Sequence, residues 1–521
     1  MTSAGGRRLA ALATLALAAC HGQRPAPAPA TPRAPAPPSP AVLAGLVSSS
    51  AAAVCAPASE SAEPIPALLA HPDAVTTLRA AAYAATSDRP RAVDVHRFGL
   101  AAFLRAVSAE GEAQERRALA APLAGSPGDT VDDLQARLAA LAGADERRAL
   151  AAAARPALAT LAAAARSTEL VRRAAAQAAA GRNAHGLVAL LTPAWGDDVG
   201  DKAQAVLSRT AALYLGALTD AAAAAGLSPR DAGAADLPRL LAAARPDPRV
   251  DAALAEIAHD AGVGDLEGLR LSDAAAVAAA GPLLCSRPTA PPAATPAAAA
   301  APAPPVAIAP TPSAVDADGA AAPRGGAPRP PAPPGADLAG RGLATCGRHV
   351  AALAIASLAA DPVFLREQGL PASPALVTAR VLATLLVARR DTAMLLAAVE
   401  ADARSDDPLT LLGRDLSDAL GLEVDPGLAA LLATHVGPFW CTASRLEAEL
   451  AAPAVVGSLT DAGGSRWWHS EPASALLREL ARSPYLRTPT GPGAVAGWVG
   501  GRPLADVITR DLLEAVPGKT P

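Results

Sequence analysis

Apolar residues recur along this chain at the spacing of an amphipathic α-helix. Two sets fall on one helix face each: Leu100, Phe103, Leu104 and Val107, then Val131, Leu134, Leu138 and Leu141. Later, Ser373-Pro374 combines an N-cap serine with a proline suited to the first helical position. Val377, Val381 and Leu385 then line one side of the helix that this pair starts. The patterns predict a succession of packed helices.

The composition supports an all-α fold. Of the 521 residues, 51% are hydrophobic but only 2% are aromatic. Sheets favour aromatic and β-branched residues, whereas alanine, which is abundant here, is the strongest helix former. The formal net charge is −4, so no basic domain indicates a nucleic-acid partner.

Two proline-rich tracts divide the chain. One covers 24–40 and the other, rich in alanine as well, covers 286–335. Proline at this density prevents a helix and favours an extended chain. We therefore expect a stalk over 20–40, a disordered linker over 286–335, and two mostly helical domains over 41–285 and 336–521. The second domain is expected to be loop-rich after His435, where glycine and proline are dense and half of the aromatic residues gather.

The N-terminus carries an export signal. A basic pair precedes an apolar stretch over 9–19, which is too short to span a bilayer and is typical of a secretory signal. The stretch ends in Leu17-Ala18-Ala19-Cys20, which resembles the lipobox of bacterial lipoproteins.

The resemblance implies three properties of the mature protein. Residues 1–19 are a cleaved signal peptide, and Cys20 becomes the first residue and carries acyl chains such as palmitate. The chain is attached to a membrane through this lipid anchor. His21, standing where an aspartate would favour retention at the inner membrane, favours the outer membrane of the cell envelope.

The remaining cysteines are candidates for disulfide bonds. They are Cys55, Cys285, Cys346 and Cys441. An exported protein lies in an oxidising compartment where disulfides persist, and four cysteines allow three pairings. The simplest pairing keeps each bond on one side of the linker, as Cys55–Cys285 and Cys346–Cys441. Free buried thiols are the alternative.

Two of these cysteines, together with two histidines, form an alternative set of metal ligands. Cys346 and His349 are three residues apart, and His435 and Cys441 are six apart. Tetrahedral zinc accepts two cysteines and two histidines, although oxidation would remove both thiolates. We expect no cofactor.

Trp467-Trp468-His469 is a candidate binding surface. Large aromatic rings often anchor a partner at an interface. In a chain so poor in aromatics, the two tryptophans are alternatively part of the core, and His469 could belong to a small-molecule site.

No catalytic motif stands out. The chain has no Gly-x-Ser-x-Gly and no His-Glu-x-x-His sequence. We therefore expect a non-catalytic scaffold or interaction module of the cell envelope, with an envelope protein as partner.

Two alternative functions stay open. One is an envelope hydrolase or metal-binding protein with its site in the second domain. The other is a carrier of lipid or another hydrophobic ligand, which requires a large apolar cavity between helices.

Overall fold

The all-α prediction is confirmed in the part of the chain that the computed structural model describes. The described residues are 54–55, 89–180, 188, 191–192, 199–228, 232–242, 248–263, 346–403 and 406–482. They belong to one compact unit, Ser39–Pro521. They contain no strand, only an isolated bridge between Pro122 and Thr130. The expected signal peptide, stalk and linker lie outside the described residues.

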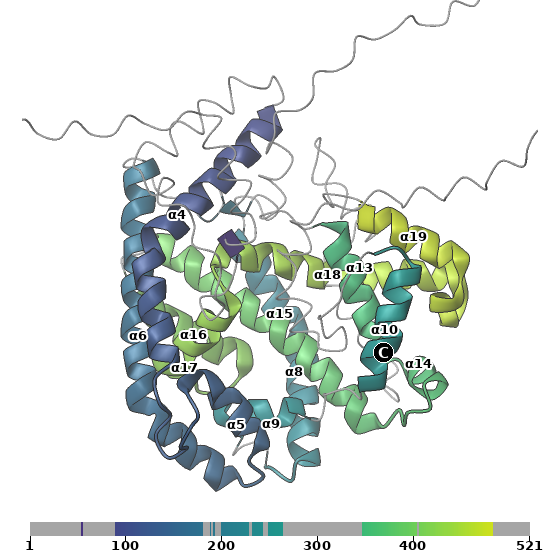
Figure 1. Ribbon diagram of the computed structural model, residues 1–521, viewed down its shortest axis with the longest axis horizontal. Coiled ribbons are helices and arrows are strands. Elements are labelled where there is room, and N and C mark those ends of the chain that lie inside the picture. The colour runs from purple at the N-terminus through teal and green to yellow at the C-terminus, as the bar shows by residue number, and fades with distance from the viewer. Residues whose placement is uncertain are drawn as a thin grey trace, which may run out of the picture. The chain divides into compact units, whose positions relative to one another are not determined.

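The helices follow one another with short connections where the chain is described (Figure 1). The earlier ones are α4 (Arg89–Leu119), α5 (Leu134–Ala140), α6 (Ala144–Ala180), α8 (Val199–Ala224), α9 (Leu237–Ala242) and α10 (Pro248–Asp260). The later ones are α13 (Gly347–Ser357), α14 (Pro362–Glu367), α15 (Pro374–Ala403), α16 (Pro408–Leu420), α17 (Pro426–Val436), α18 (Phe439–Gly463) and α19 (Glu471–Arg482). The 3₁₀ turns are η2 (Val131–Asp133), η3 (Ala234–Asp236), η4 (Leu358–Ala360) and η5 (Gly464–His469).

The starts of the later helices follow from local sequence. As predicted, α15 begins at Pro374, and the Ser373 hydroxyl accepts a hydrogen bond from the Leu376 amide at 3.2 Å. Aspartates cap other helices in the same way before a proline, which lacks the amide hydrogen that would otherwise be unsatisfied. These aspartates are Asp361, Asp407 and Asp425. The predicted apolar positions Val377, Val381 and Leu385 are all buried.

Helices from both sides of the expected linker pack in a common core. In Figure 1, α8 runs beside α15 and α6 runs beside α17. Tyr214 of α8 is fully buried, and its hydroxyl donates to the Leu420 carbonyl at the end of α16 at 3.1 Å. In the described part of the chain, the expected domains 41–285 and 336–521 therefore do not form separate cores. Each supplies apolar helix faces that the other covers.

Arg389 of α15 links three of these helices. Its Nε donates to the Ala419 carbonyl at 2.5 Å. Its Nη1 donates to the Leu207 carbonyl at 2.6 Å and to the Thr210 hydroxyl at 2.7 Å. The guanidinium also lies 5.0 Å from the centre of the Tyr214 ring. This buried arginine thus joins α8, α15 and α16 through satisfied hydrogen bonds.

The region after His435 is more helical than expected. Phe439–Gly463 forms the long helix α18, and α19 follows after a short 3₁₀ turn. The loop-rich prediction is therefore wrong up to Arg482, because Pro453 and Gly457 are accommodated inside a packed helix whose tertiary contacts outweigh their low helix propensity. Residues 483–521 lie outside the described part.

Among the described helices, none combines the length and the apolar character that crossing a membrane requires.

Candidate binding cavity

A cavity of about 540 Å³ lies between α13, α15 and α18. The segment η4–α14 and Trp467 of η5 complete its wall. Its volume falls within the range of small-molecule sites, about 300–1,000 Å³.

The wall of the cavity is mostly apolar. The apolar side chains come from every surrounding element: Leu353, Ala356, Leu358, Pro362, Val363, Val377, Val381, Val387, Ala452, Pro453, Val456 and Trp467. A smaller number of polar side chains interrupt them: Ser357, Asp361, Arg380, Thr384, Glu449, Thr460 and Ser465. Apolar walls with a few placed polar groups are typical of sites that bind small organic molecules.

Glu449 is a polar group of this wall without a local partner for its side chain. It is 7% exposed, and neither carboxyl oxygen has a hydrogen-bond partner among the described residues. Pro453, four residues later in α18, has no amide hydrogen, so it cannot donate to the Glu449 carbonyl as a helical residue normally does. The Glu449 carbonyl therefore lacks the usual helical hydrogen bond from the residue four positions later.

Burial raises the pKa of Glu449 well above the usual value, and the nearby charge of Asp391 raises it further. The positive charges of Arg445 and Arg390 oppose this shift without cancelling it. Burial thus favours the protonated carboxylic acid of Glu449, which has a donor as well as an acceptor, more than water does for an exposed glutamate.

Asp391 of α15, unlike Glu449, has arginine partners for its carboxylate. It is fully buried, but it accepts a hydrogen bond from the Arg445 Nε and pairs with Arg390 at 2.9 Å. Arg445 in turn donates to the Val436 carbonyl at 3.0 Å. This network is complete without a ligand, whereas Glu449 beside it is not.

Arg380 of α15 brings a positive charge to the same cavity. Its side chain lines the space and is 7% exposed.

The two tryptophans of the candidate binding surface are buried. Trp467 is 3% and Trp468 7% exposed, in agreement with the core alternative. The Trp468 Nε1 donates to Glu367 Oε2 at 3.0 Å, and the His469 Nε2 lies 3.1 Å from the same oxygen. His469 itself is exposed. An exposed surface made of both rings is therefore not formed, and Trp467 instead lines the cavity.

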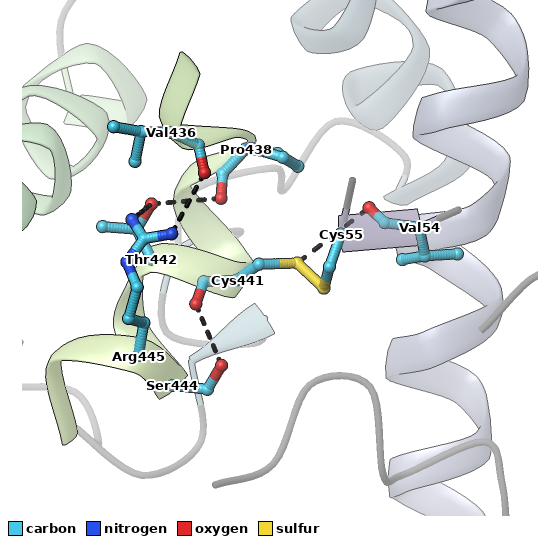
Figure 2. The surroundings of a disulfide bond; sticks show 8 residues. All are labelled: Val54, Cys55, Val436, Pro438, Cys441, Thr442, Ser444 and Arg445. Carbon is cyan, nitrogen blue, oxygen red and sulfur yellow. Dashed lines mark hydrogen bonds between the residues drawn. A yellow bond between two sulfur atoms is a disulfide. The ribbon is translucent and has the colours of Figure 1, made fainter. Parts of the chain in front are cut away.

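The expected disulfide pairing is wrong. Figure 2 shows that Cys55 is bonded to Cys441, with 5.6 Å between the Cα atoms. The pairing Cys55–Cys285 is therefore not formed, and Cys285 lies outside the described residues. Cys346 is also disulfide-bonded, but Cys441 is already occupied, so Cys346–Cys441 is not formed either.

The observed pairing follows from the shared core. Val54 and Cys55 pack in one apolar cluster with Phe98 of α4 and with Trp440-Cys441 at the start of α18. The predicted pairings, each on one side of the linker, assumed that the chain folds into two separate domains. Because the early segment packs on α18, the nearest partner of Cys55 comes from the later part of the chain.

The zinc alternative is contradicted by the same bonds. Cys346 and Cys441 are oxidised and offer no thiolate. His435 of α17 is half-buried with its Nε2 3.4 Å from Asp132, while His349 is buried in α13. Within the described ranges, no group of three or more suitable side chains could hold a metal ion.

A second cavity, of about 110 Å³, is lined in part by α4 and α6. Its charged wall includes Arg105 and Arg172, and both pair with Glu112, at 2.9 Å and 2.6 Å. Because this space is much smaller and its arginines are paired with Glu112, this cavity is the weaker candidate.

Comparison with known proteins gave no match to a protein-family model, to a curated protein or to a solved structure.

Sequence reasoning missed Glu449 and Arg380. A glutamate in an alanine-rich helix is usually read as part of a solvated face. The available signal was the apolar run AELAAPAVV, in which Glu449 stands among alanine, leucine and valine and is followed four residues later by Pro453. A charge in a run that is apolar on all sides of the helix indicates burial.

Proposed function

We propose that this protein is a binding or carrier protein for a small, mostly apolar molecule, which occupies the cavity between α13, α15 and α18. The observation that carries the proposal is the apolar cavity of about 540 Å³ with a buried, unsatisfied carboxyl in its wall. A molecule that fills the space would recover dispersion contacts and remove apolar surface from water.

The proposal includes attachment to a membrane. The lipobox resemblance of Leu17-Ala18-Ala19-Cys20 supports a lipid anchor on Cys20 at the outer membrane. Two or more acyl chains anchor a protein stably, and an anchored carrier would encounter hydrophobic molecules where they concentrate. The scaffold alternative has less support, because the tryptophans expected to contact a partner are buried.

The test of the proposal is ligand binding by the compact unit 39–521, which contains every described helix. Native mass spectrometry of the purified protein is expected to show a co-purified small molecule. After extraction, the protein is expected to bind the neutral fluorescent probe N-phenylnaphthylamine in a saturable manner.

A matched pair of variants locates the bound probe. Ala452→Phe places a ring in the cavity wall and is expected to weaken probe binding by about tenfold or more, since the added volume competes with the ligand. Val171→Phe makes the same kind of change on the exposed side of α6 and is expected to leave binding unchanged. Equal binding by both variants, or no saturable binding by the parent protein, would contradict the proposal.

A further inference from the structure

We propose that the ligand of the cavity is an uncharged alcohol with an elongated apolar body, bound with its hydroxyl at the Glu449 carboxyl and its body along α18. This inference rests on the proposed function and names the class of molecule that the same site takes. It is carried by the place of Glu449 in the cavity, by the hydrogen bonds of the other polar side chains and by the apolar stripe that continues along the helix.

The first step is the position of Glu449 at one end of the cavity. Arg445, one turn earlier in α18, pairs with the fully buried Asp391 of α15. Val387, one turn before Asp391, lines the cavity, as Glu449 does, and both side chains are buried. The cavity therefore begins beside this ion pair, and Glu449 lies at its buried end.

The lining residues of α18 extend away from this buried end along one face of the helix. In chain order they are Glu449, Ala452, Pro453, Val456 and Thr460. They span about 16 Å of the helix axis, at the helical rise of about 1.5 Å per residue. Thr460, the last of them, is exposed, as is Ser465 beyond it. The site is thus elongated, with a buried carboxyl at one end and exposed hydroxyls at the other.

The second step is the missing hydrogen bond of Glu449. Its carboxyl oxygens have no hydrogen-bond partner among the described residues. Other polar side chains of the wall have partners: the Ser357 and Thr460 hydroxyls donate to carbonyls of their own helices at 2.6 Å and 2.9 Å. Asp361 Oδ1 accepts from two amides of α14 at 2.7 Å and 2.9 Å. A buried polar group without a partner costs free energy, which a ligand recovers by completing the hydrogen bond to Glu449.

The third step is the kind of group that completes this bond. A hydroxyl both donates and accepts, so it pairs with a carboxylate, which only accepts, and with a carboxylic acid, which does both. An anionic head group would place a like charge beside an ionised Glu449. An ammonium group has three donors to satisfy, but the wall next to Glu449 is apolar from Ala452 to Val456, and an ion without enough partners is costly there. An uncharged alcohol therefore fits Glu449 in either protonation state.

The fourth step is the body of the ligand. Beyond Glu449, apolar side chains face the space from several elements, among them Val377 and Val381 of α15, Leu353 of α13 and Trp467. Removing apolar surface from water favours binding. Such a wall accommodates a hydrocarbon chain or ring system that extends from the hydroxyl toward the exposed end.

The first experiment compares three head groups on one chain. The extracted protein is titrated with decanol, decanoic acid and decylamine, by displacement of N-phenylnaphthylamine below their critical micelle concentrations. Decanol is expected to bind about tenfold or more tightly than the other two, because removing an ion from water costs more than removing a hydroxyl. Decanoic acid is the most demanding comparison, since the Arg380 guanidinium also lines the cavity. The unaltered protein is used, so this result does not depend on a variant that folds.

The second experiment assigns the hydroxyl contact to Glu449. Decanol is compared with fluorodecane, in which a fluorine of similar size replaces the hydroxyl and donates no hydrogen bond. The preference for decanol, as a ratio of dissociation constants, is measured in the parent protein and in Glu449→Leu, so that the different hydration of the two compounds cancels. This preference is expected to fall about tenfold in Glu449→Leu. Glu449→Gln, whose amide both donates and accepts, is expected to retain it.

The outcomes distinguish the two proposals. If N-phenylnaphthylamine itself does not bind, the proposed function fails. If the probe binds but decanoic acid or decylamine equals or exceeds decanol, the carrier function stands and the alcohol inference is overturned. An unchanged preference for decanol in Glu449→Leu also overturns it. A melting temperature for each variant separates a lost contact from a lost fold.

Discussion

Two buried carboxyl groups near each other on α15 and α18 show how much a side chain depends on its immediate partners. Asp391 is fully buried yet contacts two arginines, Arg390 and Arg445. Glu449 is almost equally buried and contacts no hydrogen-bond donor. Removing one partner of a buried ion pair is costly, so loss of Asp391 or Arg445 alone is expected to destabilise the fold, whereas Glu449 has no such partner to lose.

The environment of Glu449 predicts an inverted pH dependence of stability. Its pKa is raised in the folded protein, so above the ordinary glutamate value, about 4.3, the folded state binds more protons than the unfolded state. The free energy of unfolding contributed by this group therefore falls as the pH rises toward the folded pKa. Glu449→Gln removes this fall, so the variant is expected to gain stability relative to the parent protein as the pH rises above the ordinary glutamate value.

Urea denaturation of the ligand-free protein at several pH values measures this difference. The control is Glu479→Gln, on the exposed side of α19, which is expected to follow the parent curve. Parallel curves for the parent protein and Glu449→Gln would contradict a raised pKa at this site.

At the scale of elements, α13 and α19 approach each other closely at the start of α13. A Cβ atom built on Gly347 would lie 1.8 Å from the Leu480 carbonyl oxygen of α19 and 2.7 Å from its carbon. Both neighbours are backbone atoms, which cannot move aside as a flexible side chain can. The two helices therefore pack at a distance that only glycine permits at this position.

Gly347→Ala is expected to destabilise the protein by at least about 1–3 kcal/mol, the usual cost of overpacking. Gly457→Ala is the matched control, because it lies inside α18 and an added Cβ meets nothing within 4 Å. That change is expected to be neutral or to stabilise by up to about 1 kcal/mol through helix propensity. Thermal unfolding followed by circular dichroism measures both, and equal melting temperatures for the two variants would contradict the close packing.

At the scale of the whole molecule, contacts between distant parts of the sequence hold the described helices together. Arg166 of α6 forms a two-fold hydrogen bond with Asp407, the cap of α16, at 2.8 Å and 3.0 Å. The Cys55–Cys441 bond joins residues 386 apart in the sequence. A bond that closes so long a loop restricts the unfolded chain strongly, and its stabilisation belongs at the upper end of the range of about 0–5 kcal/mol.

Peptide mapping under non-reducing conditions tests this bond. A cross-linked peptide that contains both Cys55 and Cys441 is expected, and a peptide that links Cys55 to Cys285 would contradict the observed pairing. The double variant Cys55→Ser/Cys441→Ser, which leaves Cys346 unchanged, is expected to lose about 2–5 kcal/mol of unfolding free energy.

The sequence predicted those features that depend on near neighbours along the chain. The helical class, the start at Ser373-Pro374 and the buried face of Val377 and Val381 all follow from local spacing, and the structure confirms them. The lipid anchor on Cys20 stays a prediction, since it lies outside the described residues.

The features that depend on which helix faces meet could not be predicted. The sequence does not show that Cys55 pairs with Cys441, because this pairing depends on α18 packing beside a segment far earlier in the chain. Glu449 is recognisable as part of a site only when α13 and α15 enclose it. Spacing in one sequence does not contain that information.

The Cys55–Cys441 bond has a consequence for the order of events during biosynthesis. Synthesis proceeds from the N-terminus, so Cys55 is made long before Cys441, and Cys285 and Cys346 are made between them. No nascent chain shorter than 441 residues can contain the native bond. Cys55 must therefore stay reduced until the last cysteine arrives, or else form a bond that thiol–disulfide exchange later corrects. The final covalent connection of this protein is made only after nearly all of its chain exists.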